Sequence, residues 1–387
     1  MRQAAFVPFL ANSTGEMNAE LLANVSSLGI VGLGWQMADR LATDPARFIN
    51  PSLFGHLEAR QAATAARLKT LRPGLRVLVS ASMSATSAFW RVTQEAMANS
   101  TRAAELFLHW PNGSIFLDSW GDNNPAPWYN WSNPRAVQYW IHHGPVAEAM
   151  GSPHIDGVYL DGADMGVRHG RGVGAYDCHV FANSAQQSKY ITDAHTALTE
   201  AVTYYRKLQP HKWLTGYVSS RACTSHGGVD CRFHCPTGAC AGPTQLAPLH
   251  GGPNPKCAPT MRSLIATSNR TDQTLYVEPE PVATFKCQHM DWSKPSDTWD
   301  CSLASTRDPS VYVAAFLVAR GPSAMFQITV QPMFVLDYVR QFPSLRIEPG
   351  QPRGVAKEIV QGVFERDFNN LTVRFDCNHF NASFVYH

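Results

Sequence analysis

The chain has 387 residues, of which 44% are hydrophobic and only 16% charged, a balance that excludes extended disorder and favours an ordered, well-buried core. Its formal net charge is +2, from 32 basic and 30 acidic residues, and without a polybasic run this excludes nucleic acid and anionic membranes as expected partners. No apolar run reaches the ~20 residues that a membrane-spanning helix needs, so no membrane span is expected.

Short apolar runs with the composition of buried parallel strands recur along the chain, with helical patterns between them. The runs are 4–10, 29–33, 76–82, 155–160, 213–220, 274–281 and 323–330. The intervening helices are predicted over 18–27, 54–71, 86–106, 135–150, 183–208, 259–268 and 308–319. Seven or eight such repeats predict an α/β fold, and they favour a closed (β/α)8 TIM-type barrel over an open sheet, although the eighth strand is not identified.

Long connections and a different C-terminal pattern complete the predicted architecture. The Cys-, Gly- and Pro-rich stretch 221–258 is too long for an ordinary connection, which favours a functional or disulfide-ordered loop. From Gly362 onward, alternating apolar residues predict strands joined through Asn369 and Asn370, a hairpin-like turn. We therefore expect a catalytic barrel over 1–350 and a small antiparallel β appendage over 351–387 that packs on it.

The nine cysteines favour disulfides, and hence an oxidising compartment. Five lie between Cys223 and Cys257, two bracket a loop at Cys287 and Cys301, and Cys178 and Cys377 stand apart. We expect a Cys287–Cys301 pair because these two residues flank a single loop. A zinc site is the alternative, since CTSHGGVDCRFHC (223–235) mixes Cys and His, but its spacing is irregular and lacks CxxC units. Neither a metal nor a cofactor is expected.

Glycosylation sequons support the same compartment. Eight Asn-x-Ser/Thr sequons are present, at Asn12, Asn24, Asn99, Asn112, Asn130, Asn269, Asn370 and Asn381. So many sequons predict N-linked glycans on a secreted eukaryotic protein. The first residues, MRQAAFVPFLANSTGEM, lack the sustained apolar core of a signal peptide, so either a leader has been removed or the expectation of secretion is wrong.

Two strand ends carry carboxylates. The run 155–160 leads into Asp161, and the run 274–281 contains Glu278 and Glu280. Catalytic groups of barrels lie where strands end, and glycosidic cleavage needs two carboxylates across the scissile bond. Strands four and six of a closed barrel would face one another across its mouth, so Asp161 and Glu278 are the expected catalytic pair. Glu280 is the competitor to Glu278, and a helix-capping or loop-anchoring role is the alternative for Asp161.

Further side chains are expected to bind substrate around this pair. They are Trp35, Asp118, Trp120, Asp164 and Tyr217, with Glu280 as a sixth. Trp35, Asp118, Trp120 and Tyr217 follow the ends of apolar runs. Because the strand ends of a parallel barrel converge on one face, these four residues and Asp164 should line one cleft with Asp161. Each has a structural alternative: Trp35 could pack against the fold, and Asp118 or Asp164 could stabilise a turn.

A family resemblance agrees with this hypothesis. The segment WYNWSNPRAVQYWI (128–141) followed by IDGVYLDGAD (155–164) resembles TIM-barrel glycoside hydrolases, both retaining α-glycosidases and the family of endo-α-1,4-polygalactosaminidase and related glycosyl hydrolases. The C-terminal GVFERDFNNLTVRFDC (362–377) is also similar to the hairpin of such hydrolases. The resemblance implies that Asp161 is catalytic and that Glu278 is its partner. Asn130 departs from the pattern, since many relatives have Asp there.

The expected function is a secreted glycoside hydrolase that acts on the O-glycosidic bonds of a polysaccharide or glycan. Two alternatives stay open: a catalytically inactive carbohydrate-binding barrel, and a zinc-dependent hydrolase that uses the Cys/His-rich loop. Serine-based catalysis has little support, since no G-x-S-x-G motif is present.

Overall fold

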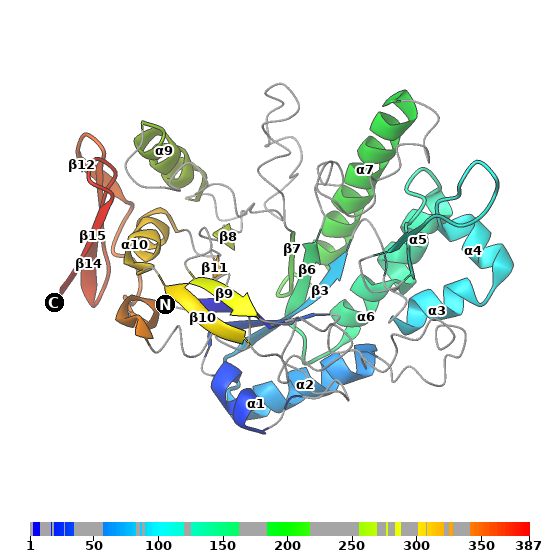
Figure 1. Ribbon diagram of the computed structural model, residues 1–387, viewed down its shortest axis with the longest axis horizontal. Helices are drawn as coiled ribbons and strands as arrows, with labels where there is room; N and C mark the ends of the chain where they lie inside the picture. Colours follow the sequence, from blue (N-terminus) through cyan, green and yellow to red (C-terminus); the bar gives the residue numbers. More distant parts are fainter. Residues whose placement is uncertain are drawn as a thin grey trace.

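The computed structural model describes residues 3–7, 17, 19–26, 28–34, 57–82, 86, 90–119, 125–161, 184–216, 255–268, 276–277, 283–287, 301–306, 308–320, 325–327 and 341–387. Its centre is a sheet of seven parallel strands (Figure 1). They are β1 (Gln3–Val7), β2 (Ile30–Leu33), β3 (Arg76–Ser82), β6 (Gly157–Asp161), β7 (Trp213–Gly216), β8 (Tyr276–Val277) and β11 (Met325–Gln327). Each overlaps one of the seven predicted runs, so the prediction of these strands is confirmed.

The order of strands across this sheet is β7-β6-β3-β2-β1-β11-β8. From β1 to β7 the order follows the chain, as expected when each strand is followed by a helix and a parallel return. Within the described residues, β7 and β8 stand at the two ends of the order. Closure into a barrel therefore stays a prediction, whereas the parallel, helix-covered sheet is shown.

The predicted helices are present, and two of them are divided. The helices are α1 (Ala19–Ser26), α2 (Leu57–Leu71), α3 (Arg91–Met97), α4 (Ser100–Leu106), α5 (Pro134–His143), α6 (Pro145–Gly151), α7 (Ser184–Leu208), α9 (Cys257–Ser268) and α10 (Ser310–Ala319). The run 86–106 splits because the Asn99 side chain accepts from the Arg102 N–H and starts α4. The run 135–150 splits at Gly144, where Pro145 occupies the first position of α6.

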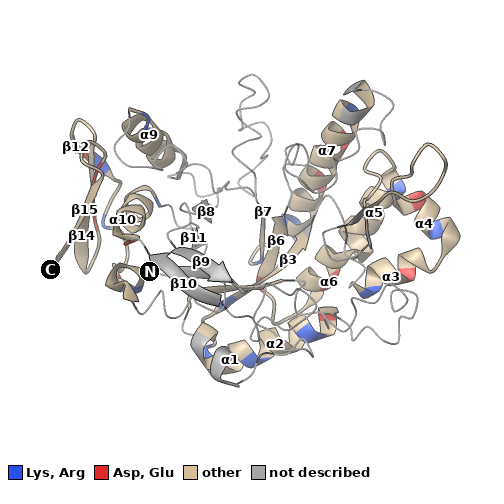
Figure 2. Ribbon diagram, in the orientation of Figure 1, with Lys and Arg blue, Asp and Glu red and all other residues tan. Residues whose placement is uncertain are grey.

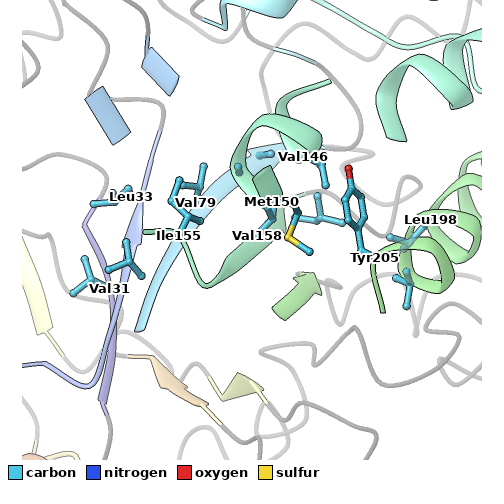
Figure 3. Packing of buried hydrophobic residues seen from close by; sticks show 14 of the residues in the cluster. Val31, Leu33, Val79, Val146, Met150, Ile155, Val158, Leu198 and Tyr205 are labelled. Carbon is cyan, nitrogen blue, oxygen red and sulfur yellow. The ribbon is translucent and has the colours of Figure 1, made fainter. Parts of the chain in front are cut away.

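The core lies between the sheet and its helices. Val31, Val79 and Val158, on three neighbouring strands, are fully buried. Figure 3 shows Val158 beside Met150 of α6, with Val79 and then Val31 to the left and Tyr205 of α7 to the right. Strands buried on both faces read as continuous apolar runs, which is why the strand pattern was legible in the sequence.

Charges of both signs occur on the helices around this core. In Figure 2, both signs are interspersed along α2, α3, α4 and α7. Lys69 and Asp156 illustrate the arrangement, since their 2.6 Å ion pair joins α2 to the start of β6. Helices α2, α3, α4 and α7 thus carry charges of both signs.

A four-stranded antiparallel sheet forms the C-terminus, as predicted. Its strands are β12 (Lys357–Val360), β13 (Val363–Asp367), β14 (Leu371–Asp376) and β15 (Asn381–Tyr386), in that order. The β13–β14 connection includes Asn369 and Asn370, the predicted turn. Leu371, Val373 and Phe375 are buried on the face of β14. The division at residue 351 into two domains stays a prediction.

A disulfide and a buried arginine attach this sheet to the helices. A disulfide joins Cys257, at the start of α9, to Cys377, just after β14. The buried guanidinium of Arg366 donates to the carbonyls of Val318 and Arg320 at the end of α10, and burial lowers the pKa of Arg366. A cation at a helix C-terminus satisfies carbonyls that have no partner within the helix.

Candidate functional site

Asp161 is the last residue of β6, and its register partner is Ser82, the last residue of β3. Three further strands of the sheet end just before predicted site residues: β2 before Gly34 and Trp35, β7 before Tyr217, and β8 before Glu278. Because all seven strands are parallel, these ends lie along one edge of the sheet. The strand positions expected for a barrel mouth are therefore present.

The structure describes the side chain of none of the eight predicted site residues. Six predicted residues lie outside the described part of the chain: Trp35, Trp120, Asp164, Tyr217, Glu278 and Glu280. For Asp161 and Asp118 the backbone alone is described. The distance between the catalytic carboxylates, and the lining of one cleft, thus stay predictions.

Asp118 lies in the middle of β4 (Leu117–Ser119), and not at the end of a strand of the parallel sheet. β4 pairs antiparallel with β5 (Pro125–Pro127) in a separate two-stranded sheet. The Thr86 N–H donates to the Pro127 carbonyl at 2.9 Å, and Thr86 follows Ser82 by only four residues. This bond anchors the β4–β5 pair close to the edge where β3 and β6 end.

The aromatic residues of 128–141 pack against each other. Trp131 and Trp140 are 2% and 0% exposed, and their rings meet edge to face at 5.2 Å. The Tyr190 hydroxyl, on α7, donates to the Tyr129 carbonyl at 2.7 Å. Burial raises the pKa of both tyrosines above their ordinary value. For these tryptophans the role is packing rather than stacking on a sugar, a distinction that burial decides.

The Asn-Pro pair of the same segment has a local structural role. Asn133 caps α5, since its side chain accepts from the Arg135 N–H at 3.0 Å and donates to the Glu105 carbonyl at 2.6 Å. Pro134 then occupies the first position of the helix, where a missing N–H costs nothing. Asn130, the residue that departs from the family pattern, is half-buried, and its N–H donates to the Leu106 carbonyl. The Asn-Pro pair thus starts α5 and ties it to α4.

A cavity of about 1040 Å³ lies between α2, α3, α5 and α6. It extends from Glu58 to Ile155, the residue two positions before β6, so it runs along the outside of the sheet and not over the strand ends. Arg91 lies in it and pairs with Glu95 and with Glu148, both at 2.6 Å. Two of its three carboxylates are thus already neutralised.

The third carboxylate of this cavity, Glu58, was not singled out from the sequence. Its Oε1 accepts from the Val92 N–H at 3.4 Å, and burial raises its pKa. The one available signal was its position in the first turn of α2, where acidic residues are common. The cavity offers no pair of unneutralised carboxylates, so we retain the strand ends as the candidate active site.

The described residues contain neither a cluster of metal ligands nor a helix that could span a membrane. Within the described residues, no group of three or more His, Cys, Asp or Glu could hold a metal ion, while the segment 223–235 lies outside them. None of the described helices combines the length and apolarity that crossing a bilayer requires.

Comparison with known proteins gives structural matches only. No family model matches the chain, and no curated protein does. It is similar to an α-amylase from Lactobacillus plantarum (14% identity, 96% of this chain and 87% of that one, TM-score 0.47). It is also similar to an α-amylase from Geobacillus thermoleovorans complexed with acarbose (13% identity, 96% of this chain and 85% of that one, TM-score 0.46). A third similar structure is a cyclic α-maltosyl-(1→6)-maltose hydrolase from Arthrobacter globiformis (12% identity, 95% of this chain and 85% of that one, TM-score 0.45). Likeness at this level does not establish an activity for this chain.

Proposed function

We propose that this chain is a glycoside hydrolase that cleaves O-glycosidic bonds of a polysaccharide or glycan. The proposal is supported by two strand ends of one parallel sheet: Asp161 is the last residue of β6, and Glu278 is the next residue in the sequence after β8. Strand ends of parallel α/β sheets hold catalytic side chains rigidly while the loops leave room for substrate. Two carboxylates and a water molecule suffice for the reaction.

Each carboxylate has a role. Asp161, as a strand residue, is the nucleophile or base on one side of the sugar ring. Glu278 is the general acid that protonates the leaving oxygen, because Glu280, two residues on, adds a negative charge that favours a protonated neighbour. A carboxyl separation of about 5–5.5 Å would give retention through a glycosyl-enzyme, and ~6.5–9.5 Å would give inversion.

Substrate contacts are assigned to the loops above these strand ends. Trp35, Trp120 and Tyr217 provide ring faces for stacking on sugars, while Asp118, Asp164 and Glu280 accept hydrogen bonds from hydroxyl groups. The Thr86–Pro127 bond supports this assignment for Asp118, since it anchors the β4–β5 pair close to the end of β3.

The proposed compartment is the secretory pathway. The Cys257–Cys377 disulfide supports it, since such bonds persist in oxidising compartments. The eight sequons support it as well. The proposed partners are accordingly a carbohydrate substrate and surface N-linked glycans.

Hydrolysis of a polysaccharide panel tests the proposal. Wild-type protein should release new reducing ends from at least one polysaccharide, and NMR of the first product reports its anomer. Asp161→Asn, prepared in parallel, should release none above background. Binding of a polysaccharide without hydrolysis would contradict the proposal and support the inactive carbohydrate-binding barrel. Activity abolished by a chelator and restored by zinc would instead support the metal-dependent alternative.

A further inference from the structure

The C-terminal sheet has two outer strands, β12 and β15, that differ in how they are protected. An outer strand presents unpaired N–H and C=O groups on which another chain can add a strand, and natural proteins block this with charges, proline, bulges or a covering segment. β12 has three such devices: Lys357, Glu358, and a register shift between Glu358 and Val360. Glu358 also binds Arg262 of α9 at 2.7 Å.

β15 has none of these devices. Its sequence, NASFVY, contains no charge and no proline, and its register with β14 is regular over all six pairs. Among the residues that the structure describes, β15 pairs with β14 alone. Val385 and Tyr386 are 58% and 64% exposed, so the described chain does not cover its end.

The pattern of hydrogen bonds with β14 shows which backbone groups of β15 are directed outward. The His387 N–H donates to the Asn370 carbonyl, which makes these two a hydrogen-bonded pair. Hydrogen-bonded and non-hydrogen-bonded pairs alternate in an antiparallel ladder, so the N–H and C=O groups of Ala382, Phe384 and Tyr386 are directed away from β14.

The side chain of Asn381 lies on this outer edge. Its Oδ1 accepts from the Ala382 N–H at 2.8 Å, and that N–H is the first of the outward-directed donors. Asn381 is exposed and begins the sequon Asn381-Ala382-Ser383. A glycan on its Nδ2 would therefore extend from the edge itself, where a bulky hydrophilic group excludes an incoming strand.

We propose that Asn381 carries an N-linked glycan and that this glycan blocks strand addition on β15. The proposal rests on the proposed secretory location and not on glycoside hydrolysis. An unmodified β15 would instead pair with a second copy of the chain through its free edge.

Protein secreted from eukaryotic cells allows both parts to be measured. Mass spectrometry of its glycopeptides should show Asn381 occupied. Ser383→Ala removes this sequon while the Asn381 side chain stays, and light scattering at increasing concentration should then show about a doubling of the weight-average mass or more, as β15 edges pair. Ser114→Ala is the matched control, since it removes the sequon of Asn112 in the turn 111–114, and it should stay monomeric like the wild type.

Two rescue variants separate the glycan from a folding defect. Ser383→Thr keeps the sequon and should remain occupied and monomeric. Ser383→Glu removes the sequon but places a carboxylate opposite Arg374, its register partner, and this edge charge should also prevent association. A bare Asn381, or a monomeric Ser383→Ala at all concentrations, would overturn the proposal. Neither measurement reads activity, so failure of the proposed hydrolase would leave both results unchanged.

Discussion

Asp161 lies directly beside Ser82, and each is the last residue of its strand. Four residues after Ser82, the Thr86 N–H donates to the Pro127 carbonyl, so the segment that begins at Trp128 is tied to the chain that follows β3. The same segment, 128–141, carries the family resemblance. Among the other candidates, Tyr217 follows β7 in the sequence, and Glu278 and Glu280 follow β8.

Removing the Tyr190 hydroxyl tests how the segment 128–141 is held in the fold. Tyr190→Phe removes the donor to the buried Tyr129 carbonyl and should lower the free energy of unfolding by about 1–2 kcal/mol, since a buried acceptor loses its partner. The matched exposed change, Tyr204→Phe, should stay within about 0.5 kcal/mol of wild type. Urea denaturation measures both. Equal effects of the two substitutions would contradict a structural role for the Tyr190 hydroxyl.

The disulfide between Cys257 and Cys377 should contribute strongly to stability. It links residues 120 positions apart. Closing so long a loop limits the unfolded chain, and removing both cysteines as Cys257→Ala/Cys377→Ala should cost about 2–5 kcal/mol. Denaturation of the oxidised double variant against wild type provides the measurement. Unchanged stability would show that the link does not form in solution.

A second disulfide is expected between Cys287 and Cys301. Cys287 ends β9 (Ala283–Cys287), Cys301 begins β10 (Cys301–Thr306), and the antiparallel register places them opposite each other. Cross-strand partners have Cα atoms ~4.5–5.5 Å apart, within the range that a disulfide spans. Non-reducing peptide mapping should recover both cysteines in one linked peptide. Two free thiols would contradict the prediction.

Glu58 predicts a specific dependence of stability on pH. Because burial raises its pKa, the folded protein retains this proton to a higher pH than the unfolded chain does. The free energy of unfolding therefore falls as the pH rises above the ordinary value of 4.5. Glu58→Gln should remove this loss, so the variant should be more stable than wild type at neutral pH. Below the ordinary value both side chains are uncharged, and their denaturation curves should meet there; a gap that is constant with pH would contradict the assignment.

Much of the fold was predictable because each strand is followed by a local helix pattern. The seven apolar runs identified the strands of the main sheet, and the turn at Asn369–Asn370 was also predicted. The helix breaks at Asn99 and Gly144 were not predicted, because the helical pattern of apolar residues continues across both. The first break depends on the Asn99 side chain, which caps the Arg102 N–H, and the second on Pro145. Periodicity reports burial, and it is insensitive to a single cap.

Long-range relationships were less accessible. The pairing of Cys257 with Cys377 joins two segments 120 residues apart, and nine cysteines permit many connectivities. Asp118 shows a similar limit, since the apolar run before it resembles a strand of the main sheet, but β4 pairs with β5 instead. For Asp161, in contrast, the apolar run 155–160 was enough to predict that this residue lies at the end of a strand.

The identity of the general acid has its own test. Glu278→Gln should lower kcat on substrates with poor leaving groups by about 10²–10⁴-fold, the usual contribution of general acid–base catalysis. Glu280→Gln should act mainly on KM. A large loss of kcat in Glu280→Gln, with an effect mainly on KM in Glu278→Gln, would identify Glu280 as the general acid.

The most direct test compares the two ends of β6. Asp161→Asn should reduce kcat/KM on the first active polysaccharide by at least about 10²–10⁴-fold while the unfolding transition is unchanged. Asp156→Asn, at the residue just before the same strand, removes the 2.6 Å ion pair with Lys69 and should lower stability by up to about 1 kcal/mol while kcat/KM is kept. Full turnover by Asp161→Asn would contradict the account.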